Sequence, residues 1–194
     1  MDFSKTLLLI IDVQNDFCPG GALAVNNGGE VIAPLNALSL KVTKEGGRAA
    51  ATQDWHPKGH ISFSTWPEHC VQGTFGAALH QKLNMDPVSL IIRKGFRMEL
   101  DSYSAFFEND RKTLTGLEGW IFSLGIDTVI MGGLATDYCV FYSAMDCKKL
   151  GLNTIVISDA VRGVGMPEGS IEAALSEMKS NGIEFLSSTE INSF

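Results

Sequence analysis

Runs of β-branched and apolar residues alternate along the chain with longer amphipathic stretches. Such runs are typical of buried strands, and the amphipathic stretches are typical of helices that cover a sheet. We expect strands at residues 6–12, 48–53, 89–93, 128–132, 154–158 and 183–186. We expect helices around residues 30–45, 114–124, 137–150 and 168–180, and Gly46-Gly47, Gly125, Gly151 and Asn181-Gly182 follow them. Glycine commonly ends a helix, so its positions support these boundaries.

The order of these elements predicts the fold class. Strands this apolar are usually buried on both faces, and alternating strands and helices indicate a parallel sheet between two helix layers. We therefore predict a three-layer α/β/α fold of the Rossmann-like type, with a mainly parallel sheet of about six strands. The chain has no internal repeat, low-complexity tract or linker, so we expect one domain over residues 1–194. Residues 17–29 and 55–74 do not follow the alternation, and long ordered loops of this kind are often functional.

Composition narrows the class of partner and the compartment. The chain is 45% hydrophobic and 19% charged, and its net charge of −7 with a pI near 5.0 argues against nucleic acid or an anionic membrane surface as partner. The early apolar run at residues 7–11 is too short to span a bilayer and lacks a signal-peptide cleavage site. We therefore expect a cytoplasmic protein whose cysteines are free thiols. Cys18, Cys70 and Cys147 are interpreted as packing residues.

In an open parallel sheet, ligands bind at the carboxyl ends of the strands, so the residues there are the first candidates for a site. Asp12, Asp54 and Lys94 stand at the ends of the first three predicted strands. The fourth strand leads through a Gly-Gly turn to Cys139, and Asp159 follows the fifth, further along the same edge. A single aspartate after a strand is usually a helix cap or a turn former. Several reactive groups on one edge instead predict a site.

Cys139 is the candidate nucleophile, and a buried cysteine that only packs on the sheet is the alternative. At a helix start the positive end of the dipole favours thiolate, so we expect a lowered thiol pKa, and the free N–H groups of the first turn can hold an oxyanion. The nucleophile needs a proton acceptor, and Asp12 is a better candidate than the histidines, which cluster after the second strand. Lys94 would organise this pair; the alternative is a surface lysine at a strand end.

The segment QDWHPKGHISFSTWPEHC holds three of the four histidines. Asp54 and His56 are separated by one residue, which in an extended segment puts both side chains on one face. With His69 they form a set of one carboxylate and two imidazoles that suits Zn²⁺, Mn²⁺ or Fe²⁺ and leaves positions open for water or substrate. His60 is a further possible ligand, a partner of a ligand, or an ordinary loop histidine.

Two aromatic residues flank the same region. Phe17 follows Asp12 closely, and Trp66 lies in the histidine-containing loop. Large aromatic residues are usually core, but a Phe and a Trp in two functional loops are also suited to sandwich a flat ring. The residues thus predict a flat substrate beside a thiol and a metal ion.

These residues stand in segments that resemble the isochorismatase-like cysteine hydrolases, and within them the nicotinamidase/pyrazinamidase branch. The matching segments are LLLIIDVQNDFCPGGAL, TQDWHPKGHISF, WPEHCVQGT, IIRKG, DSYSAF, GLATDYCV and ISDAVRG, in family order over nearly the whole chain. The family's fold, a parallel sheet of about six strands between helix layers, agrees with the predicted alternation. Relatives that act on isochorismate or other non-pyridine substrates generally lack the D-x-H…H set.

The resemblance implies a role for each candidate residue. The implied catalytic triad is Asp12, Lys94 and Cys139, and the implied metal ligands are Asp54, His56 and His69. The implied cofactor is one divalent ion per chain, with zinc expected and manganese or iron as alternatives. The residues implied to contact substrate are Phe17, Trp66, Tyr103 and Ala135. Leu134-Ala135 matches a cis peptide that shapes the family's oxyanion hole, to which the backbone N–H groups of Ala135 and Cys139 would contribute.

The reaction that this resemblance implies is hydrolysis of nicotinamide to nicotinate and ammonia through a thioester, in NAD salvage, with pyrazinamide as a second substrate. Relatives commonly self-associate, so a homo-oligomer is expected. Three alternatives stay open from the sequence. They are a metal-dependent hydrolase with a bystander cysteine, a cysteine hydrolase for another small amide or for isochorismate, and a catalytically silent small-molecule-binding protein.

Overall fold

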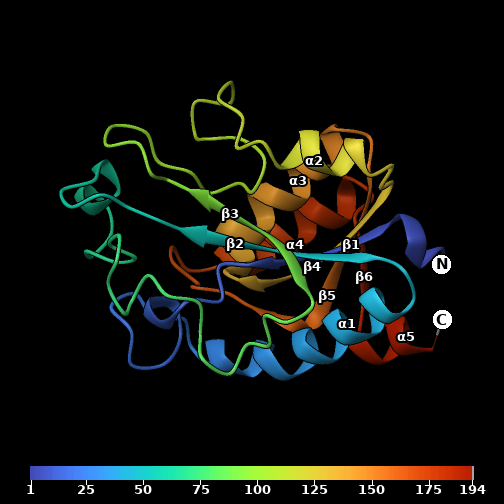
Figure 1. Ribbon diagram of the computed structural model, residues 1–194. Coiled ribbons are helices and arrows are strands. Elements are labelled where there is room, and N and C mark those ends of the chain that lie inside the picture. Colours follow the sequence, from blue (N-terminus) through green and yellow to red (C-terminus); the bar gives the residue numbers. More distant parts are fainter. Residues whose placement is uncertain (194) are drawn as a thin grey trace.

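A six-stranded parallel sheet forms the centre of the molecule (Figure 1). The computed structural model describes residues 1–193, so the last residue of the predicted 1–194 domain lies outside the described part. In spatial order the strands are β3 (Val88–Lys94), β2 (Arg48–Asp54), β1 (Thr6–Ile11), β4 (Thr128–Leu134), β5 (Asn153–Arg162) and β6 (Glu184–Leu186). All neighbouring strands run parallel. The predicted fold class and the six predicted strands are confirmed.

Helices cover both faces of this sheet. Figure 1 shows α1 (Ile32–Lys44) and α5 (Ser188–Asn192) on one face, and α2 (Leu117–Ser123), α3 (Phe141–Lys149) and α4 (Ser170–Ser180) on the other. The central strand β1 shows why two layers form, because all six of its residues are buried. Successive side chains of a strand point to opposite faces, so Leu8 and Ile10 pack with the α1 core and Leu7 and Leu9 pack with the α3 core.

Three elements differ from the prediction. The predicted strand at 154–158 continues to Arg162, because β5 bulges against β4 and then pairs with it again. The predicted helix at 137–150 is divided into a π-helical turn (Thr136–Val140) and α3. The short helix α5 was not predicted, although its start carries a capping box in which the side chains of Ser187 and Glu190 bond each other's backbone N–H groups.

The longest connections lie beyond the carboxyl ends of β1, β2 and β3. Figure 1 shows residues 12–31 and the first part of the 55–87 connection gathered at the end to which the β2 and β3 arrows point, while the last part of that connection runs back past α1 to the start of β3. Residues 95–116 form a further excursion beside the first group. These regions and the amino terminus include the 3₁₀ helices η1 (Phe3–Lys5), η2 (Asn15–Phe17), η3 (Gly28–Val31) and η4 (Ile61–Ser64). Within residues 1–193, no helix combines the length and the hydropathy needed to cross a membrane.

Gly133 allows the closest backbone approach in the sheet, and this generates a stability prediction. Its φ is +132°, and a Cβ at this position would lie 2.0 Å from the carbonyl oxygen of Ile11 on β1. Gly133→Ala is therefore expected to lower the free energy of unfolding by about 3 kcal/mol, measured by urea denaturation. Gly119→Ala is the matched control, because Gly119 lies within α2 with no atom near the added carbon. The control is expected to gain about 0.5–1 kcal/mol, and equal midpoints for the two variants would contradict the prediction.

Candidate functional site

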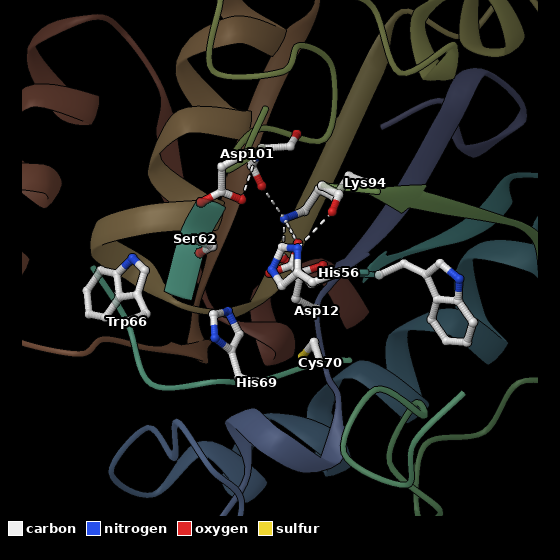
Figure 2. A network of polar contacts seen from close by, with 12 residues as sticks. Asp12, His56, Ser62, Trp66, His69, Cys70, Lys94 and Asp101 are labelled. Atoms are coloured by element: carbon white, nitrogen blue, oxygen red, sulfur yellow. Dashed lines mark hydrogen bonds and ion pairs between the residues drawn. The ribbon is translucent and has the colours of Figure 1, made fainter. Parts of the chain in front are cut away.

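A buried lysine lies at the centre of the site. Lys94, at the end of β3, has no solvent exposure, and its ammonium lies 2.9 Å from Asp12 Oδ2 and 2.5 Å from Asp54 Oδ1 (Figure 2). It also donates to the Ser102 carbonyl at 2.9 Å and lies 3.6 Å from Cys139 Sγ. Burial alone would lower the pKa of Lys94, but Asp12 and Asp54 outweigh it and raise that pKa well above its usual value. The lysine is therefore charged and buried; the surface-lysine alternative is wrong.

Asp12 follows β1 in a left-handed conformation, with φ of 49°, and its side chain is fully buried. Thr52 on the neighbouring strand donates to Asp12 Oδ1 at 2.6 Å and accepts from the Asp12 backbone N–H at 3.1 Å. Burial raises the pKa of Asp12, while Lys94 and the Thr52 hydrogen bond act in the opposite direction. The result is a carboxyl group with raised proton affinity next to the thiol. Thr52 was not predicted, because no sequence feature distinguishes it from the other residues of the strand.

Cys139 lies in the π-helical turn after β4 and is 7% exposed. Burial raises its pKa well above the usual value against the opposing effect of Lys94, and the negative charges of Asp12 and Asp54 raise it further. The predicted low thiol pKa is therefore wrong. The cost of burying a thiolate outweighs the favourable effect of the helix dipole. The first turn of this helix is π-helical and has no side-chain cap. The thiol thus has a raised proton affinity, and its sulfur lies within 4.8 Å of an Asp12 carboxylate oxygen.

The segment that leads to this turn has the expected backbone. The Leu134–Ala135 peptide is cis, as the resemblance implied. The Ala135 carbonyl accepts from the N–H groups of Tyr138 at 3.1 Å and Val140 at 3.0 Å, whereas no acceptor for the Ala135 N–H is found among residues 1–193. An N–H without a partner beside Cys139 is the type of group that can stabilise an oxyanion.

Asp54, His56 and His69 come together as the D-x-H…H pattern predicted, with ligand atoms within 4.8 Å of one another. His56 Nδ1 bonds the Gly95 carbonyl at 2.8 Å, and His69 Nδ1 bonds the Pro67 carbonyl at 2.7 Å. These carbonyls need an N–H at Nδ1, so each Nε2 carries the lone pair, as in metal-binding histidines. Figure 2 shows the two rings near Lys94 and Asp12.

His56 Nε2 supplies a test of whether a metal ion fits. This nitrogen is buried and has no hydrogen-bond partner among the described residues, and it lies 3.6 Å from Asp54 Oδ2. A buried polar atom without a partner is costly, and a cation bound between the two groups would remove that cost. The residues therefore fit a divalent metal ion.

His60 lies next to this set in a different way. Its ring stacks on His56 with centroids 4.3 Å apart and planes 13° apart. Its Nδ1 accepts from the Ser62 N–H at 3.3 Å, and its Nε2 faces the Leu100 carbonyl at 3.3 Å. Both nitrogens thus have backbone partners, which favours a role in supporting His56 over the role of ligand.

A pocket of about 450 Å³, including its mouth, opens beside these groups. The predicted residues Phe17, Trp66, Tyr103, Ala135 and Cys139 all line it. Residues that also line it and were not predicted are Leu23, Val25, Ser62, Asp101, Leu134, Tyr138 and Val164.

The aromatic wall of the pocket is connected by direct contacts. Trp66 Nε1 donates to the Tyr103 hydroxyl at 3.1 Å, and the Trp66 ring meets Tyr138 edge-on at 5.0 Å. Phe17 packs against His69 with centroids 5.5 Å apart. Tyr138 stands directly before Cys139 in the sequence, and this adjacency is the signal that would have identified it.

Asp159, expected further along the same edge, bonds the start of α5 and none of the described residues around Lys94. Because β5 continues past it, its carboxylate accepts from the Ser188 N–H at 2.7 Å and from the Ser188 hydroxyl at 2.5 Å, at the start of α5. Cys18, Cys70 and Cys147 are buried free thiols packed in the two cores, as predicted.

Comparison with known proteins agrees with this arrangement. The family model described as an isochorismatase domain matches residues 6–190. The chain belongs to the isochorismatase family. Its relatives include a nicotinamidase from Acinetobacter baylyi, which is 44% identical over 95% of this chain and 93% of that protein.

Two solved structures extend the similarity within the family. A nicotinamidase/pyrazinamidase from Acinetobacter baumanii has a TM-score of 0.92 and 41% identity, covering 97% of this chain and 98% of that one. A pyrazinamidase from Pyrococcus horikoshii, solved in complex with zinc, has a TM-score of 0.84 and 38% identity over 94% of this chain and 99% of that one. The chain therefore resembles this branch over almost its whole length.

The different surroundings of the histidines predict different effects on metal binding. His56→Ala and His69→Ala each remove a free Nε2, so the purified variants are expected to lose their bound metal. His60→Ala removes a ring whose nitrogens bond backbone, so it is expected to keep about one ion per chain, with affinity lowered at most about 10–100-fold. Elemental analysis and competition with a chelator measure both quantities. Loss of metal from His60→Ala as complete as from His69→Ala would make His60 a ligand.

Proposed function

We propose that this protein is a nicotinamidase, which hydrolyses nicotinamide to nicotinate and ammonia through a thioester on Cys139. The observation that carries the proposal is the position of the thiol. It lies at the wall of an aromatic pocket, with its sulfur within 4.8 Å of an Asp12 carboxylate oxygen and 3.6 Å from the Lys94 ammonium. The nicotinamidases among the relatives support the substrate class. Pyrazinamide is also a flat azine carboxamide and is proposed as a second substrate.

The first half of the reaction follows from the contacts of Cys139. Asp12 takes the thiol proton, and the sulfur attacks the carboxamide carbon of a ring held between Phe17 and Trp66. The N–H groups of Ala135 and Cys139 bind the oxygen that becomes negative; a single such donor typically contributes about 3 kcal/mol. Asp12 then gives the proton to the departing nitrogen, so ammonia leaves and the acyl group stays on sulfur as a thioester.

The second half uses the same residues. Asp12, again a carboxylate, takes a proton from water, and the water oxygen attacks the thioester carbon. The acyl–sulfur bond breaks, the proton returns to sulfur, and nicotinic acid ionises to nicotinate as it leaves. Lys94 stays charged throughout and holds Asp12 and Cys139 in position, because it contacts both.

Asp54, His56 and His69 would hold one divalent ion, and we propose zinc, with manganese or iron as alternatives that the same ligands accept. The ion would act as a Lewis acid toward a ring nitrogen or a water molecule. The zinc complex of the Pyrococcus horikoshii pyrazinamidase supports this choice. The orphaned Nε2 of His56 supports it from this chain alone.

We place the reaction in the cytoplasm, in NAD salvage. The four cysteines are free in the structure, which suits a reducing compartment. Assembly into a homo-oligomer stays a prediction, which light scattering of the purified protein tests directly.

Release of ammonia from nicotinamide tests the proposed function. The native, metal-loaded protein is expected to turn over, and Cys139→Ala is expected to fall below detection while it keeps its metal, because the thioester cannot form. Cys147→Ala is the matched control, since Cys147 is also a buried cysteine, in the following helix, but does not line the pocket. It is expected to keep its kcat within about threefold.

Each alternative predicts a different result in that assay. Substantial activity in Cys139→Ala would indicate a metal-bound nucleophile and a bystander cysteine. An inactive native protein whose Cys139 reacts with a thiol reagent would indicate a cysteine hydrolase for another substrate. An inactive native protein whose Cys139 does not react would indicate a silent binding protein.

A further inference from the structure

The loop after β5, residues 163–169, borders the pocket through Val164 and is attached to the turn that carries Cys139. Asp137, two residues before Cys139, makes the main attachment. Its Oδ1 accepts from the Val164 N–H at 2.9 Å, and its Oδ2 accepts from the Gly165 N–H at 2.9 Å and the Ser170 hydroxyl at 2.6 Å. Asp137 is 8% exposed, and it is a carboxylate with both oxygens engaged by one loop.

The next residue makes a second attachment to the same loop. The Tyr138 hydroxyl donates to the Met166 carbonyl at 2.5 Å, while its ring lines the pocket. Two consecutive residues of the turn thus hold the loop through three hydrogen bonds and the start of α4 through a fourth. Their carboxylate–amide bonds are of the charge-assisted kind, which is stronger than bonds between neutral groups.

Two glycines of the loop allow its backbone to come close to Asp137. A Cβ on Gly163 would lie 3.1 Å from Asp137 Oδ1 and 2.5 Å from the Ile171 side chain, and Gly165 has φ of +72°. Glycine at both positions therefore lets consecutive backbone N–H groups point at one carboxylate, as in an anion-binding nest.

Apart from the Lys94–Cys139 contact, the side-chain hydrogen bonds between this turn and other parts of the described chain all come from Asp137 and Tyr138. The turn is π-helical, and Ala135, directly before it, gives no side-chain cap. Yet the proposed mechanism needs the N–H groups of Ala135 and Cys139 to point at one oxygen, and displacement of about 1 Å in a reacting group can cost about 100-fold in rate. The carboxylate of Asp137 is the contact that ties this turn to α4 and to the pocket wall together.

We propose that Asp137 is a positioning residue for amide hydrolysis, which holds the Cys139 turn and residues 163–170 in register so that the oxyanion donors and the Val164 wall face the same substrate. The role rests on the proposed function. Asp137 does not touch the reacting atoms; it acts through Cys139 and Val164.

Asp137→Asn is the direct test, because asparagine has the same shape but carries an N–H₂ group in place of one carboxylate oxygen. That group would face either the Val164 N–H or the Gly165 N–H and the Ser170 hydroxyl, which are themselves donors. We expect kcat for nicotinamide to fall about 10–100-fold, with KM changed less than about threefold, since the donors act mainly in the transition state. Hydrogen exchange at the Val164 and Gly165 amides is expected to accelerate. These two readouts separate positioning from a loss of fold.

Asp146→Asn is the matched control. Asp146 is a buried carboxylate on α3 that pairs with Arg111 at 2.9 Å and does not line the pocket. This variant is expected to have a lower melting temperature but the native kcat and KM when assayed well below that temperature. If Asp137→Asn does not fold, the double variant Tyr138→Phe/Ser170→Ala removes two of the four bonds and is expected to lower kcat about 3–10-fold.

The outcomes separate the two proposals. If the native enzyme turns over nicotinamide and Asp137→Asn keeps its kcat within twofold of native, the positioning role is overturned and the nicotinamidase function stands. The same holds for the double variant where it replaces Asp137→Asn. An equal loss of kcat in Asp146→Asn would also overturn it, because the effect would then reflect general destabilisation. An inactive native enzyme would overturn the proposed function and, with it, this role.

Discussion

The site depends on one buried charge. An ammonium group without solvent would be strongly destabilising unless anions and carbonyls surround it, and Lys94 has two carboxylates and one carbonyl within 2.9 Å. Its partners come from three places in the chain: the end of β1, the end of β2 and the loop after β3. The need to neutralise this charge therefore fixes how these segments meet. Cys139, which follows β4, lies 3.6 Å from the same ammonium.

Asp54 connects the two halves of the site. One oxygen pairs with Lys94, and the other lies 3.6 Å from the Nε2 of His56, where a metal ion fits. The same carboxylate thus belongs to the buried ion-pair network and to the metal-binding set. A change in either half alters the charge felt by the other, since groups in a low-dielectric interior interact strongly. Cys139, its proposed base Asp12 and the candidate metal ligands form one electrostatic unit.

The sequence was informative where a feature is local. Strand ends identified Asp12, Asp54 and Lys94, because the carboxyl ends of parallel strands must share an edge, and the D-x-H spacing identified His56. Features that depend on tertiary contacts were missed. Thr52 has no local mark, and Asp159 was expected to end the fifth strand, whereas β5 bulges there and continues. The π-helical turn was also missed, and its residues Asp137 and Tyr138 bond residues 164–170.

The correction to the pKa of Cys139 changes how the chemistry is understood. A thiolate formed in advance would be nucleophilic, but its proton would already have been lost to solvent. Ammonia is a poor leaving group unless the nitrogen is protonated, so amide cleavage needs an acid as well as a nucleophile. A buried thiol next to a buried carboxyl group keeps that proton inside the site. Burial thus makes ionisation of Cys139 harder, and by the same effect it retains the proton that the departing nitrogen requires.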